Sequence, residues 1–277
     1  MPSLRAYLQL LRPVNLLIGG FATFIGFLIL KRALDLRLLT FGIISVVLIM
    51  GGGNGLNDYY DIEIDRINQP QRPIPSGRIT PRGALIFSIL LFLGGAVISL
   101  LIGINPFLFT LSVIALLFLY NKYLKKSLLI GNILVSLLGG AVFIYIALVF
   151  NSPLRMILYP FLFAFLFHFG REVIKDTLDI RGDREMGSRT FPVVFGEKAG
   201  IILSIIIFLS LITITFLPYL SKTYGLLYLI SVIILVDIFL LAVIHSLLFK
   251  RERLRKIKEV LKIDMVLGLI SLALGSL

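Results

Sequence analysis

The sequence predicts an all-α integral membrane protein, a single domain of residues 1–277 folded as a bundle of nine transmembrane helices. Of the 277 residues, 58% are hydrophobic and only 15% are charged, and the mean hydropathy is +1.01. Soluble domains are typically about half apolar and about a quarter charged. Charge is also absent from long stretches, such as residues 83–121 and 127–154. A membrane-spanning helix needs about 20 mainly apolar residues, so these stretches are predicted to cross the bilayer.

The individual spans follow from the uncharged stretches and the turn residues between them. Gly103, Asn105 and Pro106 divide residues 83–121, which are too many for one helix, into two. Residues 16–30 lack a small-residue cleavage site and are predicted to belong to the first span, not to a signal peptide. The last span must begin within a basic segment. The nine predicted helices cover residues 13–31, 37–57, 82–103, 106–121, 128–150, 153–173, 199–218, 222–249 and 258–276.

The distribution of Lys and Arg predicts a multi-pass protein of the cell membrane with its N-terminus in the cytoplasm and its C-terminus outside. In this orientation 22 of the 27 basic residues lie on the inside. The net charge of +12 is then explained by topology and by attraction to anionic lipid headgroups, so membrane lipid is an expected partner and nucleic acid is not. Residues 250–262 are expected to lie along the headgroups as an amphipathic basic segment. Cysteine is absent, which excludes disulfide and thiol chemistry.

Two acidic segments on the predicted inner face share one spacing. Each repeats a polar residue at intervals of four, three and four. On a helix such residues share one face, where like charges repel. We call these faces the first acidic stripe, formed by Asn54, Asp58, Asp61 and Asp65, and the second acidic stripe, formed by Glu172, Asp176, Asp179 and Asp183.

The stripes have two explanations: solvated helix ends balanced by neighbouring Arg and Lys, or a site for divalent cations. The repeated spacing favours the cations. All the ligands would be oxygen atoms, which suits Mg²⁺ or Mn²⁺ better than zinc. Magnesium usually takes few protein carboxylates and shares its shell with substrate phosphates, so the stripes predict a diphosphate. Turn-rich basic segments follow each stripe, and Arg72 and Arg189 are candidates to contact phosphate oxygens.

These motifs resemble those of the UbiA superfamily of intramembrane prenyltransferases. The first motif is Asn57-Asp58-x-x-Asp61-x-x-x-Asp65 with the following Arg72-Pro73-Ile74-Pro75-Ser76-Gly77, and the second is Asp176-x-x-Asp179-x-x-x-Asp183 followed by Thr190-Phe191-Pro192. Motif order, separation and length agree over the whole chain. The lead-in Arg171-Glu172-x-x-x-Asp176 is most similar to the archaeal digeranylgeranylglyceryl phosphate synthases. Chlorophyll synthases share a very similar first motif.

The resemblance implies a Mg²⁺-dependent enzyme with an isoprenoid diphosphate donor and a lipid-like phosphate acceptor. It would transfer a geranylgeranyl group from geranylgeranyl diphosphate to the free hydroxyl of geranylgeranylglyceryl phosphate, releasing diphosphate, in archaeal ether-lipid biosynthesis. Asp58, Asp61, Asp176 and Asp179 are then the expected catalytic residues. The implied metal-binding set is Asn57, Asp58, Asp61, Asp65, Asp176, Asp179 and Asp183.

Substrate contacts are expected from residues near the inner ends of the helices. Lys122 is a phosphate contact by family position, whereas Lys125 and Lys126 are expected to serve topology. Asn57 either binds metal or caps a backbone group, and His168 is expected to be a packing histidine. Asp237, inside a predicted span, is interpreted as a buried polar partner. The expected substrate-binding residues are Arg12, Asn15, Arg72, Tyr120, Lys122, Arg171 and Lys175.

Three other functions compete with this interpretation. Within the prenyltransferases, the acceptor could instead be aromatic or porphyrin-like, as in a quinone or chlorophyll-like pathway. A transporter or channel also places acids on membrane helices, although its sites usually lie near the bilayer midplane. A structural membrane protein would not need the aspartates. Product analysis, ion flux and alanine substitution distinguish these functions.

Overall fold

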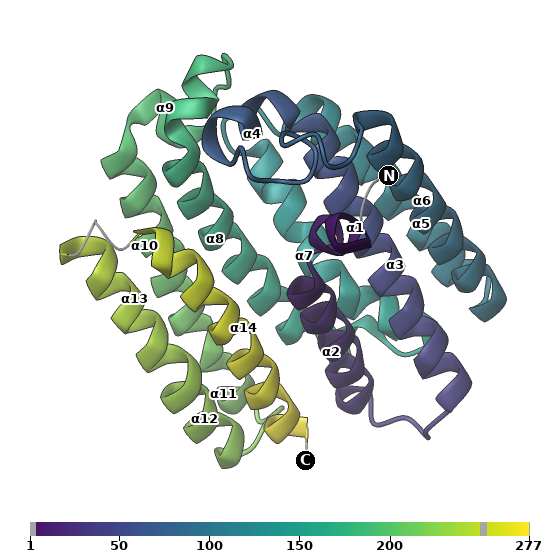
Figure 1. The fold of residues 1–277 in the computed structure, drawn as a ribbon. Coiled ribbons are helices and arrows are strands. Elements are labelled where there is room, and N and C mark those ends of the chain that lie inside the picture. The colour runs from purple at the N-terminus through teal and green to yellow at the C-terminus, as the bar shows by residue number, and fades with distance from the viewer. Residues whose placement is uncertain (1–3, 250–253, 277) are drawn as a thin grey trace.

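The computed structural model describes residues 4–249 and 254–276, and all regular secondary structure in this part of the chain is helical. The long helices run side by side in one bundle, with the short helices α4 and α9 at one end (Figure 1). In chain order the elements are α1 (Leu4–Leu11), α2 (Pro13–Ile29), α3 (Leu36–Tyr60), α4 (Ile62–Asn68), α5 (Pro81–Ile102), α6 (Ile104–Leu119), η1 (Tyr120–Leu124), α7 (Ile130–Val149), η2 (Leu154–Ile157), α8 (Leu158–Glu185), α9 (Phe191–Phe195), α10 (Glu197–Thr215), α11 (Leu217–Leu220), α12 (Leu226–Val232), η3 (Ile233–Asp237), α13 (Ile238–Phe249) and α14 (Leu254–Ser276).

Each of the nine predicted helices is present as a helix, but not all nine are shown to be spans. Within residues 4–249 and 254–276, seven helical stretches are long and apolar enough to cross a membrane, and α1 with α2, which meet at a 48° bend, make an eighth. Helix α14 is not among them, because its first half carries charges such as Glu259, Lys262 and Asp264. Of the predicted basic segment 250–262, residues 250–253 lie outside the described part of the chain.

The outer surface of the bundle is apolar. On α5, the side chains of Leu90, Leu93, Val97, Leu100 and Leu101 are all more than half exposed. Contiguous apolar surface of this kind is unfavourable in water and suits contact with lipid. This confirms the prediction that the chain is a polytopic membrane protein.

Helices α3 and α5 pack closely because glycines face α5. A Cβ atom at Gly52 would lie 3.0 Å from the Ser88 carbonyl oxygen, and one at Gly55 would lie 2.3 Å from the Ser88 hydroxyl. Small residues allow such close approach of membrane helices. The glycine run before the first acidic stripe therefore fixes α3 against α5, and the neighbouring Gly53 lines a cavity.

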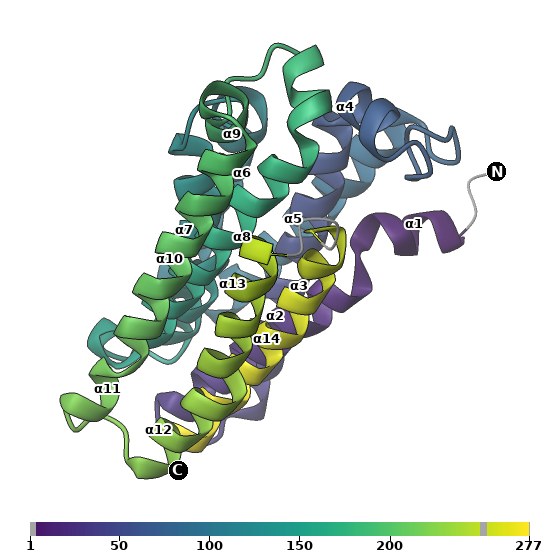
Figure 2. The ribbon, with the colours of Figure 1, turned by 90° about the vertical axis from the view of Figure 1, so that its left-hand side faces the viewer.

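The acidic stripes sit on two different helical arrangements. Helix α3 ends at Tyr60 and α4 begins at Ile62, so the first stripe is broken at Asp61. Helix α8 continues to Glu185, beyond its predicted end at residue 173, and carries the whole second stripe. A Cβ atom at Gly182 would lie 2.5 Å from the Asn68 amide nitrogen, so α4 packs directly against α8. Figure 2 shows α4 and α9 at one end of the bundle and the C-terminus at the other.

Asp237 is a buried polar partner, as predicted. The Thr215 hydroxyl donates to both of its carboxylate oxygens at 3.2 Å, and the Tyr228 hydroxyl donates to the Thr215 carbonyl at 2.9 Å. These bonds join α10, α12 and η3. Inside a membrane bundle, polar groups are stabilised when they satisfy one another in this way.

Candidate active site

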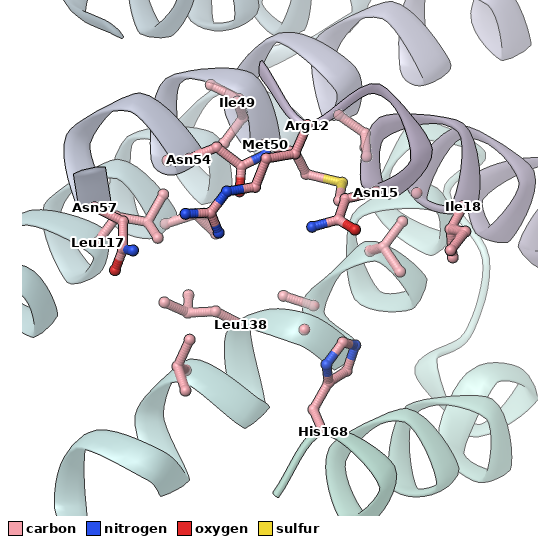
Figure 3. A pocket seen from close by; sticks show the side chains of 18 of the residues that line it. Arg12, Asn15, Ile18, Ile49, Met50, Asn54, Asn57, Leu117, Leu138 and His168 are labelled. Carbon is pink, nitrogen blue, oxygen red and sulfur yellow. The ribbon is translucent and has the colours of Figure 1, made fainter. Parts of the chain in front are cut away.

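A cavity of about 310 Å³ opens between the two halves of the bundle. Figure 3 shows Arg12, Asn15, Asn54 and Asn57 on one side of it and His168 on the other. Most of the remaining wall is apolar, from residues such as Ile18, Ile49, Val113, Leu117 and Leu138. The cavity therefore joins a polar region to an apolar chamber, which is the shape required by a ligand with a charged head and a hydrocarbon tail.

One part of the cavity wall consists of linked hydroxyls. The Ser99 hydroxyl bonds to those of Ser45, Thr110 and Tyr145 at 2.8 Å each, and three of these four residues line the cavity. The four residues come from α3, α5, α6 and α7. Their mutual bonds satisfy polar groups that would otherwise be unpaired in an apolar environment, and they hold this part of the chamber in one shape.

The first acidic stripe is paired with cations. Arg12 donates to Asp58, and Arg72 donates to Asp58 at 3.3 Å and to Asp65 at 2.6 Å. Arg12 has a positive φ of 55° and lies at the bend between α1 and α2, directly before Pro13. A left-handed conformation at a non-glycine residue is uncommon and marks a constrained position. The bend brings the Arg12 guanidinium to the buried end of α3.

Asp61 is paired with Lys125, which also donates to the Asn57 side-chain oxygen at 2.6 Å. Asn57 in turn donates to Asp61 at 3.0 Å, so its side chain is bound to an aspartate of the first stripe, and among the described residues it makes no bond to the backbone. The π-helical segment η1 places Lys125 there, since the Lys125 backbone N–H donates to the Tyr120 carbonyl five residues earlier. Such wide turns occur mainly as single insertions in α-helices and often at functional sites.

The structure does not bring Lys122 to the cavity. Its side chain is exposed and lies over the ring of Tyr123, with the ammonium 5.0 Å from the ring centroid. The wide turn of η1 points the later lysine, Lys125, toward the aspartates. The geometry thus places Lys125, and not Lys122, beside the first acidic stripe.

Two aspartates of the second acidic stripe accept hydrogen bonds from neutral side chains. Asn132 donates to Asp176 at 2.7 Å, and the Thr190 hydroxyl donates to Asp183 at 3.4 Å. In the described part of the chain, no ion pair involves Asp176, Asp179 or Asp183. Glu172, at the start of the stripe, does form ion pairs, with Arg171 and Lys175 at 3.1 Å each. This stripe therefore carries the larger uncompensated negative charge.

Burial and nearby cations act in opposite directions on the carboxyl groups between α3 and α4. Burial is the largest effect at Asp65 and raises its pKa to about 6, although Arg72 opposes the shift. At Asp61 burial is again the largest single effect and works against the charged form, but Lys125, Lys175 and Arg72 together outweigh it and lower the pKa. Desolvation disfavours the ionised form of a carboxyl group, and an adjacent cation favours it. Burial and neighbouring cations therefore shift the pKa values of these two carboxyl groups in opposite directions.

The oxygen atoms that the two stripes could offer to a metal suit a hard divalent cation. The stripes offer carboxylate and amide oxygens, which are the ligands that Mg²⁺ prefers. The second stripe holds aspartates without a cationic partner, of which Asp183 is buried. Among the described residues, no three acidic or histidine side chains are already gathered around one point. The residues thus suit a metal that shares its coordination shell with water and substrate phosphates.

The structure brings most of the predicted substrate-binding residues to one cavity. Its lining includes Arg12, Asn15, Arg72, Tyr120, Arg171 and Lys175. Tyr145 also lines the cavity, whereas Tyr123 and the Arg189 side chain are exposed. His168 lines the cavity and packs over Gly139, where a Cβ atom would lie 2.4 Å from its ring.

Sequence reasoning missed several polar residues of the site. Asn121 lines the cavity, and its buried side-chain oxygen has no hydrogen-bond partner among the described residues. Asn132 supports Asp176, and Lys262 reaches the cavity from α14. Asn121 and Asn132 are polar residues within or beside apolar helices, and that property alone could have identified them.

Comparison with known proteins identifies the family. The UbiA prenyltransferase family matches residues 20–268. The chain belongs to this family. Within the UbiA family, digeranylgeranylglyceryl phosphate synthases from Methanopyrus kandleri and Sulfolobus acidocaldarius are 35% and 38% identical to it, over 97% and 99% of this chain and 98% and 99% of theirs.

Solved UbiA structures agree with this assignment. A structure of digeranylgeranylglyceryl phosphate synthase in membranes is 33% identical, with a TM-score of 0.75 over 100% of this chain and 99% of its own. A UbiA homologue from Archaeoglobus fulgidus bound to GPP and Mg²⁺ is 18% identical, with a TM-score of 0.70 over 96% of this chain and 99% of its own, and shares the fold. The family resemblance of the two aspartate motifs is therefore confirmed.

Proposed function

We propose that the protein is a Mg²⁺-dependent intramembrane prenyltransferase of archaeal ether-lipid biosynthesis. It transfers the geranylgeranyl group of geranylgeranyl diphosphate to the free hydroxyl of geranylgeranylglyceryl phosphate and releases diphosphate. The observation that carries the proposal is the cavity that joins a charged head region, beside two acidic stripes, to an apolar chamber. The full-length similarity to digeranylgeranylglyceryl phosphate synthases supports the donor and the acceptor.

We assign the donor's diphosphate to the acidic stripes. The metal would be held by the residues of the predicted set, with Asp58, Asp61, Asp176 and Asp179 as its central ligands. When bound, Mg²⁺ would neutralise the diphosphate as a leaving group. Lys125 takes the place of the predicted contact at Lys122 and joins the predicted Arg72, since both are largely shielded from solvent and paired with aspartates of the first stripe. The seven metal-binding residues are Asn57, Asp58, Asp61, Asp65, Asp176, Asp179 and Asp183.

The transfer breaks the bond between C1 of the donor and its diphosphate oxygen, and the electron pair leaves with the diphosphate. The acceptor's hydroxyl oxygen forms the new bond to C1, and its proton passes to the departing diphosphate. The chain's own residues position the reactants and keep water away. The apolar wall of the cavity houses the donor's tail, and the buried ring of Tyr120 can stabilise positive charge that develops at C1.

We also propose a single domain with nine membrane crossings, in which α14 is the last. The acidic stripes and the loops with α4 and α9 would face the cytoplasm together with the N-terminus. The excess of basic residues in these loops supports that orientation. The C-terminus lies at the opposite end of the bundle from α4 and α9, as expected if it faces outside (Figure 2).

The test is product analysis with the full-length protein in lipid, Mg²⁺ and labelled geranylgeranyl diphosphate. Geranylgeranylglyceryl phosphate and 4-hydroxybenzoate are offered separately. We expect product from the glyceryl phosphate alone, and we expect EDTA and the substitution Asp61→Ala to abolish it. Product from the aromatic acceptor would instead place the enzyme in a quinone-type pathway. Ion flux through liposomes without any diphosphate, and no product from either acceptor, would refute the enzymatic function.

A further inference from the structure

Among the described residues, three cations that line the cavity form no ion pair with an aspartate of the acidic stripes: Arg171, Lys175 and Lys262. Lys175 is bound to Glu172 at 3.1 Å. Arg171 projects from α8 and Lys262 from α14, and both line the cavity. Helix α14 packs against α2 and α8, which brings Lys262 to the same cavity as Arg171. By contrast, Arg12, Arg72 and Lys125 each bind an aspartate of the first stripe. The cavity thus has two groups of cations with different partners.

Arg171 has hydrogen-bonding capacity that the described protein atoms leave unused. One terminal nitrogen donates to Glu172 at 3.1 Å, and the side chain is only 14% exposed. Its Nε atom is buried and has no hydrogen-bond partner in the described part of the chain. A buried donor without an acceptor is destabilising, and a guanidinium in particular retains several N–H groups to place. The geometry therefore points to an acceptor that a ligand supplies.

Lys262 provides a second positive charge for the same ligand. Its ammonium donates to Glu259 at 2.8 Å, one turn away on the same helix, and its side chain is 25% exposed. An ammonium has three donors, so this bond leaves others for a ligand in the cavity. Ion pairs between neighbouring residues of an exposed helix face are weak, and a strongly anionic ligand can compete with Glu259.

We propose that Arg171 and Lys262 form the binding site for the phosphate monoester of the acceptor, apart from the stripes that bind the donor's diphosphate. This inference rests on the proposed function and names the headgroup site within it. A phosphate monoester offers three acceptor oxygens and up to two negative charges, which match a guanidinium and an ammonium. Glu172 is a positioning residue, because it holds both Arg171 and Lys175 by direct bonds.

The experiment compares two acceptors that differ only in the phosphate. The full-length protein in lipid, with Mg²⁺ and geranylgeranyl diphosphate, is given geranylgeranylglyceryl phosphate or its dephosphorylated form, geranylgeranylglycerol. The variants are Arg171→Lys and Lys262→Gln. The control is Lys198→Gln, which removes an exposed lysine of α10 outside the cavity. The Michaelis constant for the donor, measured in parallel, reports whether each variant keeps a folded donor site.

We expect Lys262→Gln and Arg171→Lys each to raise the Michaelis constant for the phosphorylated acceptor roughly 10- to 100-fold, the size of a lost charge-assisted bond. The Michaelis constant for the donor and the rate with geranylgeranylglycerol should stay within about twofold of the control. Equal losses with both acceptors, or a wild-type protein that does not prefer the phosphorylated acceptor, would overturn the inference while the transferase activity stands. A wild-type protein that makes no product from either acceptor would refute the proposed function itself.

Discussion

In the first acidic stripe every aspartate accepts a bond from an arginine or a lysine. In the described structure no aspartate of the second stripe does so, and Asp176 and Asp183 accept bonds from neutral groups. Arg12, Arg72 and Lys125 supply the cations of the first stripe. Asn132 and Thr190 supply hydrogen bonds to the second. The first stripe thus has a structural role as well as a proposed catalytic one. The second stripe has surplus negative charge, which favours a bound cation.

The two stripes also differ in backbone. The first is divided between α3 and α4 by a break at Asp61, and segments from three other parts of the chain reach it. The second lies on the single helix α8, and two of its aspartates accept hydrogen bonds from Asn132 and Thr190. Substitutions in the two stripes should therefore have similar effects on transfer and different effects on stability. The following predictions test this difference, from the largest expected effect to the smallest.

The largest effect on transfer is expected for Asp179→Asn. Removing a ligand of the proposed metal should slow product formation roughly 10³-fold, equivalent to about 4 kcal/mol of transition-state stabilisation. The melting temperature in EDTA should not fall, because no cation loses its partner. Product formation and thermal unfolding of the same preparation measure both quantities. Activity above a tenth of wild type would contradict the assignment.

The largest effect on stability is expected for Asp58→Ala. The substitution leaves Arg12 and Arg72 beside a buried site without one of their carboxylates. Breaking a buried ion pair by removing one partner typically costs about 3–5 kcal/mol. The free energy of unfolding in detergent should fall by an amount in this range, and transfer should also be lost. Asp179→Asn is the matched comparison, and equal destabilisation by both would show that the stripes do not differ.

A smaller effect on transfer is expected for substitutions of Lys125 and Lys122, the two candidate phosphate contacts. Lys125→Gln removes the cation beside Asp61 and should reduce transfer roughly 10- to 100-fold, as expected for a lost charge-assisted bond. Lys122→Gln should remain within about twofold of wild type, because its side chain is exposed and lies over Tyr123. Steady-state rates at saturating acceptor distinguish the two. A larger loss of transfer for Lys122→Gln than for Lys125→Gln would instead support Lys122 as the phosphate contact, as expected from family position.

The smallest effect is expected for Arg66→Gln. Arg66 lies next to Asp65 in the sequence but pairs with Glu63 on the surface, with side chains that are 61% and 57% exposed. Ion pairs in solvent contribute about 0–1 kcal/mol, so stability should change by less than about 0.5 kcal/mol. Chemical unfolding of the wild type and the variant at low and high salt measures this change in stability. A loss as large as that of Asp58→Ala would mean that Arg66 acts on the stripe itself.

The helices could be predicted from the sequence because their signal is local. Lipid accepts only segments whose backbone polar groups are bonded internally, so uncharged stretches of sufficient length become helices. All nine predicted helices are present, with ends mostly within a few residues. The short helices α1, α9 and α11 were not predicted. Helix α8 extends to Glu185, beyond the predicted end of its span, as the helical spacing of the second stripe requires.

The residue types of the candidate site were also accessible from the sequence, but their pairing was not. Matched spacing identified the aspartates of both stripes, because one helical face repeats every three or four residues. The choice of Lys125 over Lys122 depends on a π turn of five residues, which no composition or periodicity indicates. Lys262 reaches the cavity only because α14 packs against α2 and α8.

The sequence by itself determined that this chain is a membrane-embedded helical bundle with two oxygen-rich stripes, since hydropathy and helical spacing are properties of contiguous residues. Only the tertiary structure decided that a cavity with an apolar chamber lies beside the stripes, and that cations compensate the aspartates of one stripe and not those of the other. Those features depend on side chains brought together from distant segments. The energy of a buried charge is set by such neighbours and by the water they exclude.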